Sequence, residues 1–342
     1  MTSPAPPRLR DHLALVLALV ALAAVVLAAL ALGKYTIPVG DVMSALTGGA
    51  RGPNATDADA VRTVLWNIRV PRVLGGLVVG AALGAAGAAY QGMFRNPLVS
   101  PDILGVSAGA GFGALLAIFL GWPVVGVQAA AFCGGLLAVG LVTLVAGRVR
   151  RHDPVLVLVL AGVAVGTLLA AGTSLLKILA DPYAQLPAMT YWLLGGLSAI
   201  TRGDVLAVAP AVVAGTVPLW LLRWRMNLLS LADEEAVALG VDVRRVRIVL
   251  VTAATLITAA AVSVSGTIGW VGLVVPHVAR LLVGPDFRRL LPMSLVLGAG
   301  FLVAADTMAR TAASVEIPLG VLTAVTGAPF FLWLLARSRR AW

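Results

Sequence analysis

Residues 13–33 read LALVLALVALAAVVLAALALG, a run without one charged side chain. As an α-helix, at about 1.5 Å per residue, this run would be about 30 Å long, which is the thickness of the hydrocarbon core of a bilayer. Arg8 and Arg10 precede it, as basic residues precede a secretory signal. The run is longer than the apolar core of a signal, so it predicts a retained membrane-spanning helix.

Apolar runs of this kind recur along the whole chain. Of its 342 residues, 60% are hydrophobic and 12% are charged, and the mean hydropathy of +0.99 lies outside the range of soluble domains. The runs are continuous and do not alternate as barrel strands do, which favours helices. We therefore expect an all-α membrane protein, one transmembrane domain over residues 1–342, with about ten transmembrane helices near residues 13–33, 73–92, 104–121, 125–147, 155–176, 205–222, 248–266, 269–283, 290–309 and 318–336.

The distribution of basic residues favours ten crossings over eleven. Residues 183–200 are uncharged and could be counted as an additional span. With ten spans and a cytoplasmic N-terminus, about two thirds of the 25 Lys and Arg face the cytoplasm, whereas eleven spans would reverse that balance. Residues 183–200 are therefore predicted to form a short helix that lies at the outer surface or is re-entrant, and both termini are expected in the cytoplasm.

Glycine and other small residues predict close helix contacts and one break. Because lipid gives no hydrophobic drive between helices, small residues at four-residue spacing allow close backbone packing. The stretch 248–283 is short for two full crossings, and broken helices of this kind need a protein interior or a cavity around them. The small-residue stripes are Gly80, Gly84 and Ala88, then Gly105, Gly109 and Gly113, then Gly162 and Gly166, and the break is marked by Ser265, Gly266, Gly269 and Gly272.

Several kinds of chemistry are missing from the sequence. The two lysines, Lys34 and Lys177, do not end a phosphate-binding loop, so an ATPase would have to be another chain. Cys133 is the only cysteine, and the three histidines lack metal-ligand spacing. The net charge of +10 comes from basic residues in short loops, which indicates membrane topology and not nucleic-acid binding. We expect no catalytic residue, no metal site and no cofactor in this chain.

Acidic residues are scarce within the predicted spans, which weakens the case for an ion-coupled secondary transporter. An ion-coupled secondary transporter usually buries acids near the bilayer centre. Here only Asp306 and Glu316 lie in spans or near them, and both are close to the outer end. Asp306 and Arg310 are four residues apart on one predicted helix, so they could pair with each other or take part in recognition. The secondary transporter remains the alternative class.

Four stretches together resemble the permease subunits of the FecCD family, importers of ferric siderophores, haem and cobalamin that depend on a binding protein. The likeness runs in order from about residue 60 to the C-terminus. The stretches are RVPR (69–72) with VGAALG (79–84), QGMFRNPL (91–98) and DILGVSAG (102–109); NLLSLADEEA (227–236) with LGV (239–241); GTIGWVGLVVPH (266–277); and Ala305, Asp306 and Arg310 with IPLGV (317–321) and GAPF (327–330).

The resemblance implies a type II ABC importer permease and places two short cytoplasmic coupling helices in residues 227–241. This segment is flanked by arginines and is too charged to enter lipid. The alternative is an ordinary solvated loop. The residues implied to contact the separate ATPase are Asp233, Glu234, Glu235, Ala236, Leu239 and Gly240.

Arg69, Arg72 and Arg310 fall on the outer side of the predicted topology, against the inward bias of positive charge. In the family, arginines at these positions meet glutamates of the soluble binding protein, and complementary charge would orient that partner. The alternative is that these side chains extend to lipid headgroups.

The resemblance also implies a cytoplasmic gate formed by Asn96, Pro97 and Leu98, closing against the segment before the fifth span. There the likeness is poorer, because Val155 and Leu156 stand where the cobalamin permeases carry small hydroxyl residues. Alternatively, Asn96 only caps a helix.

The function implied is the permease of an ABC importer in the cytoplasmic (inner) membrane. Its expected partners are an ABC ATPase, which would hold ATP and Mg²⁺, a periplasmic or lipid-anchored binding protein, and a second permease copy, with a homodimer favoured over a heterodimer. An iron complex, either a ferric siderophore or haem, is the favoured cargo, with cobalamin or molybdate as alternatives.

Overall fold

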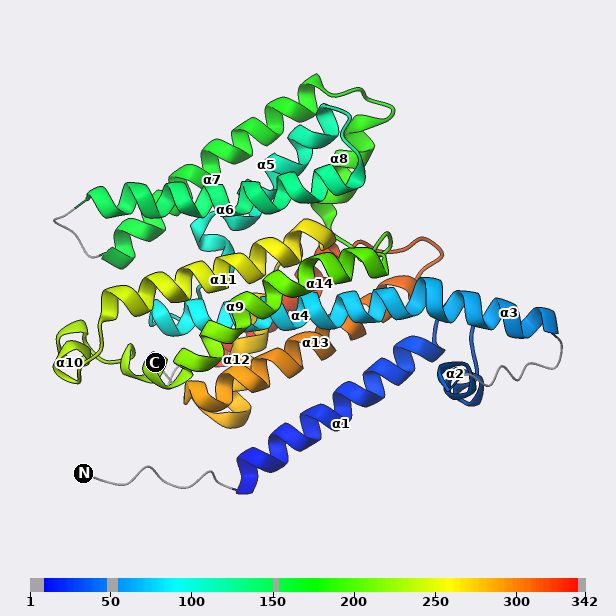
Figure 1. The fold of residues 1–342 in the computed structure, drawn as a ribbon, viewed down its shortest axis with the longest axis horizontal. Coiled ribbons are helices and arrows are strands. Elements are labelled where there is room, and N and C mark those ends of the chain that lie inside the picture. Colours follow the sequence, from blue (N-terminus) through cyan, green and yellow to red (C-terminus); the bar gives the residue numbers. More distant parts are fainter. Residues whose placement is uncertain (1–8, 48–54, 150–153, 338–342) are drawn as a thin grey trace.

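A computed structural model describes residues 9–47, 55–149 and 154–337 of the chain. Within these residues every regular element is helical, and most of the helices run side by side in one bundle (Figure 1). They are α1 (Leu9–Ala31), α2 (Val39–Leu46), α3 (Ala55–Thr63), the π-helix η1 (Val64–Arg69), α4 (Val70–Met93), the 3₁₀-helix η2 (Pro101–Leu104), α5 (Val106–Phe119), α6 (Val124–Arg148), α7 (Pro154–Leu179), α8 (Gln185–Leu194), α9 (Arg202–Leu228), α10 (Asp233–Ala238), α11 (Val243–Ser265), α12 (Val271–Val283), α13 (Phe287–Thr311) and α14 (Leu319–Arg337).

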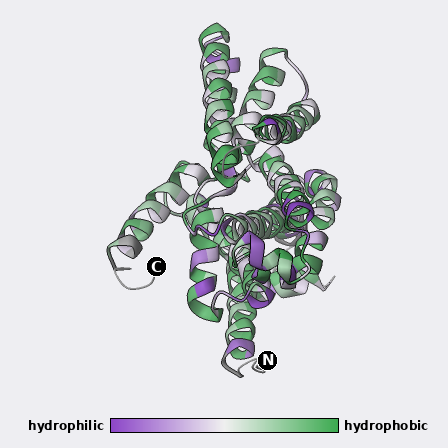
Figure 2. Cartoon of the chain, turned by 90° about the vertical axis from the view of Figure 1, so that its left-hand side faces the viewer, coloured by the Kyte–Doolittle hydropathy of each residue, from purple (hydrophilic) through white to green (hydrophobic). Residues whose placement is uncertain are grey.

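Seven helices in the described part of the chain are long and apolar enough to cross a membrane: α1, the continuous helix that ends as α4, α6, α7, α9, α11 and α13. Three shorter apolar helices, α5, α12 and α14, lie where the remaining predicted spans were expected. Residues 183–200 contain only the ten-residue α8, which at about 1.5 Å per residue is about half the length needed to cross the hydrocarbon core. Seen from the end that carries α10, most of the ribbon is hydrophobic (Figure 2).

Helix α4 is the centre of the bundle, where it packs against α9, α11, α12 and α13. Its glycines explain this position. A Cβ on Gly80 would overlap the backbone of Gly298 in α13, and a Cβ on Gly87 would overlap the backbone of Gly272 in α12. The predicted small-residue stripe therefore brings backbones into direct contact. Such close packing is needed between helices in lipid, where no hydrophobic effect drives helices together.

A second group is formed by α5, α6 and α7, together at the top of Figure 1. Gly109 of α5 faces the backbone of Gly134 in α6, and Gly162 of α7 faces the carbonyl of Ile103 in η2. In contrast, a Cβ on Gly166 would meet nothing within 4 Å. The second stripe thus packs helix on helix, whereas the third contributes one close contact.

The helical path is interrupted between α11 and α12, at the glycines that predicted this interruption. Helix α11 ends at Ser265, and α12 has 13 residues, which gives a length of about 20 Å and leaves it short of a full crossing. The broken segment is held inside the protein, since Gly196 donates its N–H to the Ser265 carbonyl at 2.8 Å. A Cβ on Gly266 would overlap the carbonyl of Trp192.

The two ends of the bundle are here named after α3 and α10, which lie at opposite ends (Figure 1). The α10 end holds the start of α1, whose Asp11 pairs with Arg289 near the start of α13. Helix α14 begins beside Gly195, where Leu319 donates its N–H to the Gly195 carbonyl at 3.0 Å, and it runs towards the α10 end. The first and the last described helix therefore have their terminal ends on the same side.

In residues 227–241, where two short helices were expected, the structure has the last residues of α9 and one short helix, α10. Helix α9 continues to Leu228, and only α10 follows before α11. The last turn of α9 is fixed by Asn227, whose amide nitrogen donates to Asp286 at 2.7 Å and whose amide oxygen accepts from the Phe287 N–H at 2.7 Å. This contact with the start of α13 keeps the residues before Leu229 helical.

Candidate functional site

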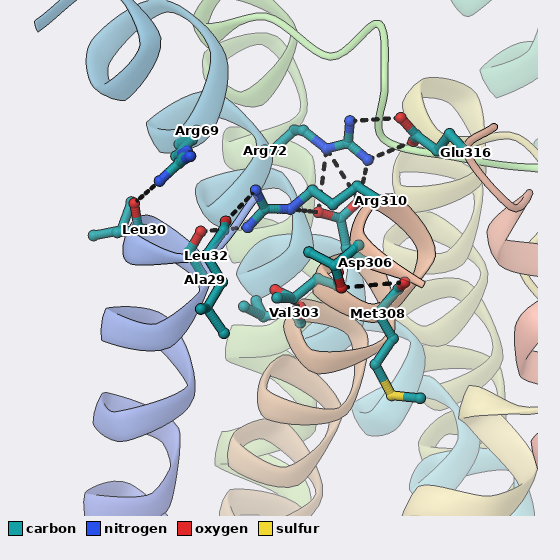
Figure 3. Close-up of polar contacts among 12 residues, drawn as sticks. Ala29, Leu30, Leu32, Arg69, Arg72, Val303, Asp306, Met308, Arg310 and Glu316 are labelled. Atoms are coloured by element: carbon teal, nitrogen blue, oxygen red, sulfur yellow. Dashed lines mark hydrogen bonds and ion pairs between the residues drawn. The ribbon is translucent and has the colours of Figure 1, made fainter. Parts of the chain in front are cut away.

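At the α3 end, Arg72 joins three segments that are far apart in sequence. Its guanidinium contacts Asp306 of α13 at 2.7 Å and Glu316, in the loop before α14, at 2.5 Å. The side chains of Arg72 and Asp306 are only 9% and 4% exposed. Arg310 approaches the other oxygen of Asp306 at 3.6 Å, so the i, i+4 pairing that the sequence left open is present, although Arg72 lies closer (Figure 3).

The other two arginines hold the end of α1. Arg69 donates to the carbonyls of Leu30 and Tyr35, and Arg310 donates to those of Ala29 and Leu32. The last carbonyls of a helix have no partner within the helix and carry its partial negative charge, so cations stabilise them. Figure 3 shows both guanidinium groups turned towards this helix end.

All three arginines predicted to meet a binding protein are thus engaged within the chain. Arg69 and Arg72 are buried, and their partners lie up to 244 positions away along the sequence. We call Arg69, Arg72, Asp306, Arg310 and Glu316 the outer charge cluster. In this conformation it fixes the positions of α1, α4, α13 and the 312–318 loop relative to one another.

Exposed cations lie next to this cluster. Arg62 and Arg202 line a cavity of about 470 Å³ together with Thr63, Trp66 and Asn67. Arg202 stacks over the Trp66 ring, with its guanidinium carbon 5.1 Å from the ring centroid. This arrangement can accept an anionic group from solvent.

A second cavity, of about 590 Å³, opens near the same end between α5, α6, α8, α9 and the loop before α14. Its wall is largely apolar and aromatic, with Trp122, Tyr191 and Trp192, and it includes the carboxylates of Asp204 and Glu316. Asp204 accepts a hydrogen bond from Gln128 at 2.8 Å. An apolar cavity with a few polar groups suits a large organic ligand.

At the α10 end, helix α4 ends in the turn that carries Asn96, Pro97 and Leu98. The Asn96 side chain accepts the Leu98 N–H at 2.9 Å, so it stabilises the turn itself. The Asn96 N–H donates to the Gln91 carbonyl and closes the last turn of α4. Leu98 is exposed. Val155 and Leu156 lie in the first turn of α7, and Leu156 is exposed as well. The structure places η2, which follows the turn, against α7 at Gly162.

Helix α10 presents most of its predicted contact residues to solvent. Glu234, Glu235, Leu239 and Gly240 are exposed, and Ala236 is fully buried. Asp233 turns back towards the protein, where it meets Arg95 and Arg247. The helix thus combines a negatively charged outer face with exposed apolar side chains, a pattern suited to a protein partner.

Comparison with known proteins decides the family. The model of the FecCD transport family matches residues 20–337. The chain belongs to the FecCD transport family.

The relatives of this FecCD protein include permeases with different printed cargoes. It is 44% identical over 322 residues to the cobalamin import system permease of Halobacterium salinarum, covering 89% of this chain and 86% of that one. It is 41% identical over 283 residues to a probable iron chelatin transport system permease of Helicobacter pylori, covering 83% and 85%. A solved metal-chelate type ABC transporter in an inward-facing conformation matches with a TM-score of 0.85 and 34% identity, covering 94% of this chain and 98% of that one.

The FecCD chain is therefore a multi-pass membrane protein and the transport permease component of an ABC transporter, with an all-helical fold of the type II importer class. Within its described residues, no three His, Cys, Asp or Glu side chains gather as metal ligands would. Sequence reasoning missed Arg62, Arg95 and Arg202 as candidates. Arg95 stands inside the QGMFRNPL motif, and only the contacts of its side chain distinguish it.

Proposed function

We propose that this chain is the membrane-spanning permease of an importer that receives an iron complex, a ferric siderophore or haem, from a soluble binding protein and releases it into the cytoplasm. The observation that carries the proposal is α10, an acidic helix beyond the bundle whose charged face stays exposed. The chain has no phosphate-binding loop of its own, so the energy must enter through a contact with another subunit.

The proposed topology has ten crossings, with both termini and α10 on the cytoplasmic side of the inner membrane. The seven long apolar helices and the three shorter ones, α5, α12 and α14, supply these crossings. The short crossings are supported by their setting, since α12 packs against α4 and α13, where irregular backbone is shielded from lipid. The excess of basic residues at the α10 end agrees with this orientation.

We propose that α10 docks on an ABC ATPase that holds ATP and Mg²⁺. Glu234 and Glu235 would supply charge, and the exposed Val237 and Leu239 would supply apolar contact. Ala236 and Gly240 would support the helix from behind and at its end. The Asn96–Leu98 turn would form the cytoplasmic gate near the start of α7, where Val155 and Leu156 stand.

The α3 end would receive the binding protein. Because Arg69, Arg72 and Arg310 are held inside the chain and largely covered, we assign them the support of this surface. We assign the contact to Arg62 and Arg202, which are exposed, although Arg202 also donates to the Trp66 carbonyl. Charge reversal of Arg62 and Arg202 to Glu should weaken docking most at low ionic strength, because salt screens exposed charges. A docking constant unchanged at low salt would refute this assignment, and Gln at both positions is the matched control for loss of charge without reversal.

A second copy of the chain would complete the pathway. Helix α7, which carries the exposed apolar residues Leu160, Leu168 and Ile178 along its length, would face this second copy or the surrounding lipid. The apolar cavity between α5, α6, α8 and α9 would then open towards the outer part of the pathway.

The proposed cargo is an iron complex. Relatives named for cobalamin and for iron chelatin are similarly distant from this chain, and another relative is named for molybdate, so cobalamin and molybdate are the alternatives. The test is reconstitution of the chain with its ATPase and binding protein in proteoliposomes, followed by uptake of a ferric siderophore, haem, cobalamin or molybdate. ATP-dependent uptake of an iron complex is expected. Uptake by the chain alone, driven by an ion gradient, would establish a secondary transporter instead.

A further inference from the structure

One side chain, Arg95, connects α4 to α10. It follows the last residues of α4 in the turn that continues to Asn96 and Leu98. Its Nη2 lies 2.5 Å from Oδ1 of Asp233, the first residue of α10, and its Nε donates to the Leu229 carbonyl at 2.7 Å. Since both contacts use the same planar guanidinium, Arg95 holds the start of α10 and the segment before it in one orientation.

Asp233 has a second partner on a different helix. Nη2 of Arg247, in the second turn of α11, lies 3.3 Å from both carboxylate oxygens of Asp233. The Arg247 side chain is only 13% exposed, whereas those of Arg95 and Asp233 are 38% and 46% exposed. Asp233 is therefore shared between a firmly placed arginine and one that reaches it from a surface turn.

The backbone of Arg95 adds a second observation. Its φ is +51°, in the left-handed region that a side chain with a Cβ rarely adopts. A residue persists in this region when its surroundings hold it there. The contacts of its guanidinium with α10 are such surroundings, and the turn directly continues to the hydrogen bond between Asn96 and Leu98.

We propose that Arg95 is the residue that transmits a displacement of α10 to the Asn96–Leu98 turn, so that an ATPase bound to α10 acts on the cytoplasmic end of the pathway through α4. This inference rests on the proposed function. Coupling between two sites needs an element whose arrangement both of them bias. The shared carboxylate of Asp233 gives two such arrangements: paired with both arginines, or with Arg247 alone when α10 moves away from the turn.

The chain offers a matched control for this pair. Asp242, the N-cap of α11, and Arg245, in its first turn, form another exposed ion pair, at 2.9 Å. Their contact joins no second element. Exposed pairs contribute little to stability, so replacing either pair should leave the protein folded and isolate the effect on coupling.

The test is cargo uptake per ATP hydrolysed by the reconstituted complex of permease, ATPase and binding protein. We expect Arg95→Ala to lower this ratio by about fivefold or more while ATP hydrolysis continues. The ratio for Arg95→Lys should lie between those of the wild type and Arg95→Ala, since an ammonium cannot reproduce both contacts. The double variant Arg95→Ala, Asp233→Ala should lose less than the sum of the two single losses, because either change alone removes the contact between Arg95 and Asp233. Arg245→Ala and Asp242→Asn should leave the ratio unchanged.

A second readout does not depend on transport. In a Cys133→Ala background, the rate of thiol labelling of Leu98→Cys should change when MgATP binds the complex, and this change should disappear with Arg95→Ala. A wild-type uptake ratio in Arg95→Ala, or a labelling change that survives this substitution, would overturn the inference. Absence of ATP-driven uptake by the wild-type complex would refute the proposed function, while the labelling experiment would still decide the role of Arg95.

Discussion

The two ends of the bundle use the same chemistry, arginine paired with carboxylate, in opposite settings. The outer charge cluster is buried between α1, α4 and α13, whereas the pair of Arg95 and Asp233 lies near the surface of the α10 end. Burial makes both members of the pair of Arg72 and Asp306 indispensable, because a charge left alone in the interior is costly. Exposure lets water replace either partner. The outer charge cluster therefore holds one arrangement of helices. The contact between Arg95 and Asp233 can break and form again, with water in its place.

The largest effect should come from removing the carboxylate at the centre of the outer charge cluster. Asp306→Ala leaves the buried Arg72 with only Glu316, and Arg310 loses its side-chain partner. We expect a loss of about 3–5 kcal/mol in the free energy of unfolding, measured by denaturant titration of the protein in detergent micelles. Arg72→Met combined with Asp306→Leu is the matched control, since it removes both charges and should recover much of this loss. A loss below about 1 kcal/mol in the single variant would show that water can reach the cluster and replace the missing carboxylate.

A smaller effect should come from the rim of the same cluster. Glu316 is one third exposed, and water can take its place beside Arg72 after Glu316→Gln. We expect a loss of about 1 kcal/mol in the same titration. Because Asp306 and Glu316 share Arg72, their effects should not be additive in the double variant. Additive losses would contradict the assignment of both to one cluster.

At the opposite end, Asp233→Asn should change stability by less than about 1 kcal/mol. Its partners are the half-exposed Arg95 and the largely covered Arg247, which leave the carboxylate partly open to solvent. Because salt screens exposed charges, the difference from the wild type should shrink between low and high ionic strength. The same titration at two salt concentrations measures it. A salt-independent loss as large as that of Asp306→Ala would remove the contrast between the two ends.

The sequence predicted the parts of this molecule that follow from local pattern. Apolar run length located the long helices, glycine spacing located the contacts of α4, and the i, i+4 spacing of Asp306 and Arg310 gave their pairing as one of two alternatives. These signals are local because helix periodicity and span length are local. Local pattern therefore predicted where the long helices lie along the chain.

Contacts between distant residues could not be predicted in this way. Arg72 and Glu316 are 244 positions apart, so no spacing rule joins them, and their meeting depends on how α4 and α13 pack. For the same reason, arginines expected on an outer surface proved to be buried. The end of α9 is likewise held by a distant contact, that of Asn227 with the start of α13, which local pattern does not reveal.

The smallest effect should come from Asp242, and it decides whether geometry or net charge matters at the α10 end. Asp242 caps α11 by accepting the Arg245 N–H at 3.0 Å, and an asparagine oxygen can accept the same bond. Its ion-pair partner is 87% exposed, so Asp242→Asn should change the free energy of unfolding by no more than about 0.5 kcal/mol. The charge removed equals that removed by Asp233→Asn. If both variants nevertheless lowered uptake per ATP equally, the negative charge of this surface would be the active quantity, and the contact with Arg95 would lose its special role.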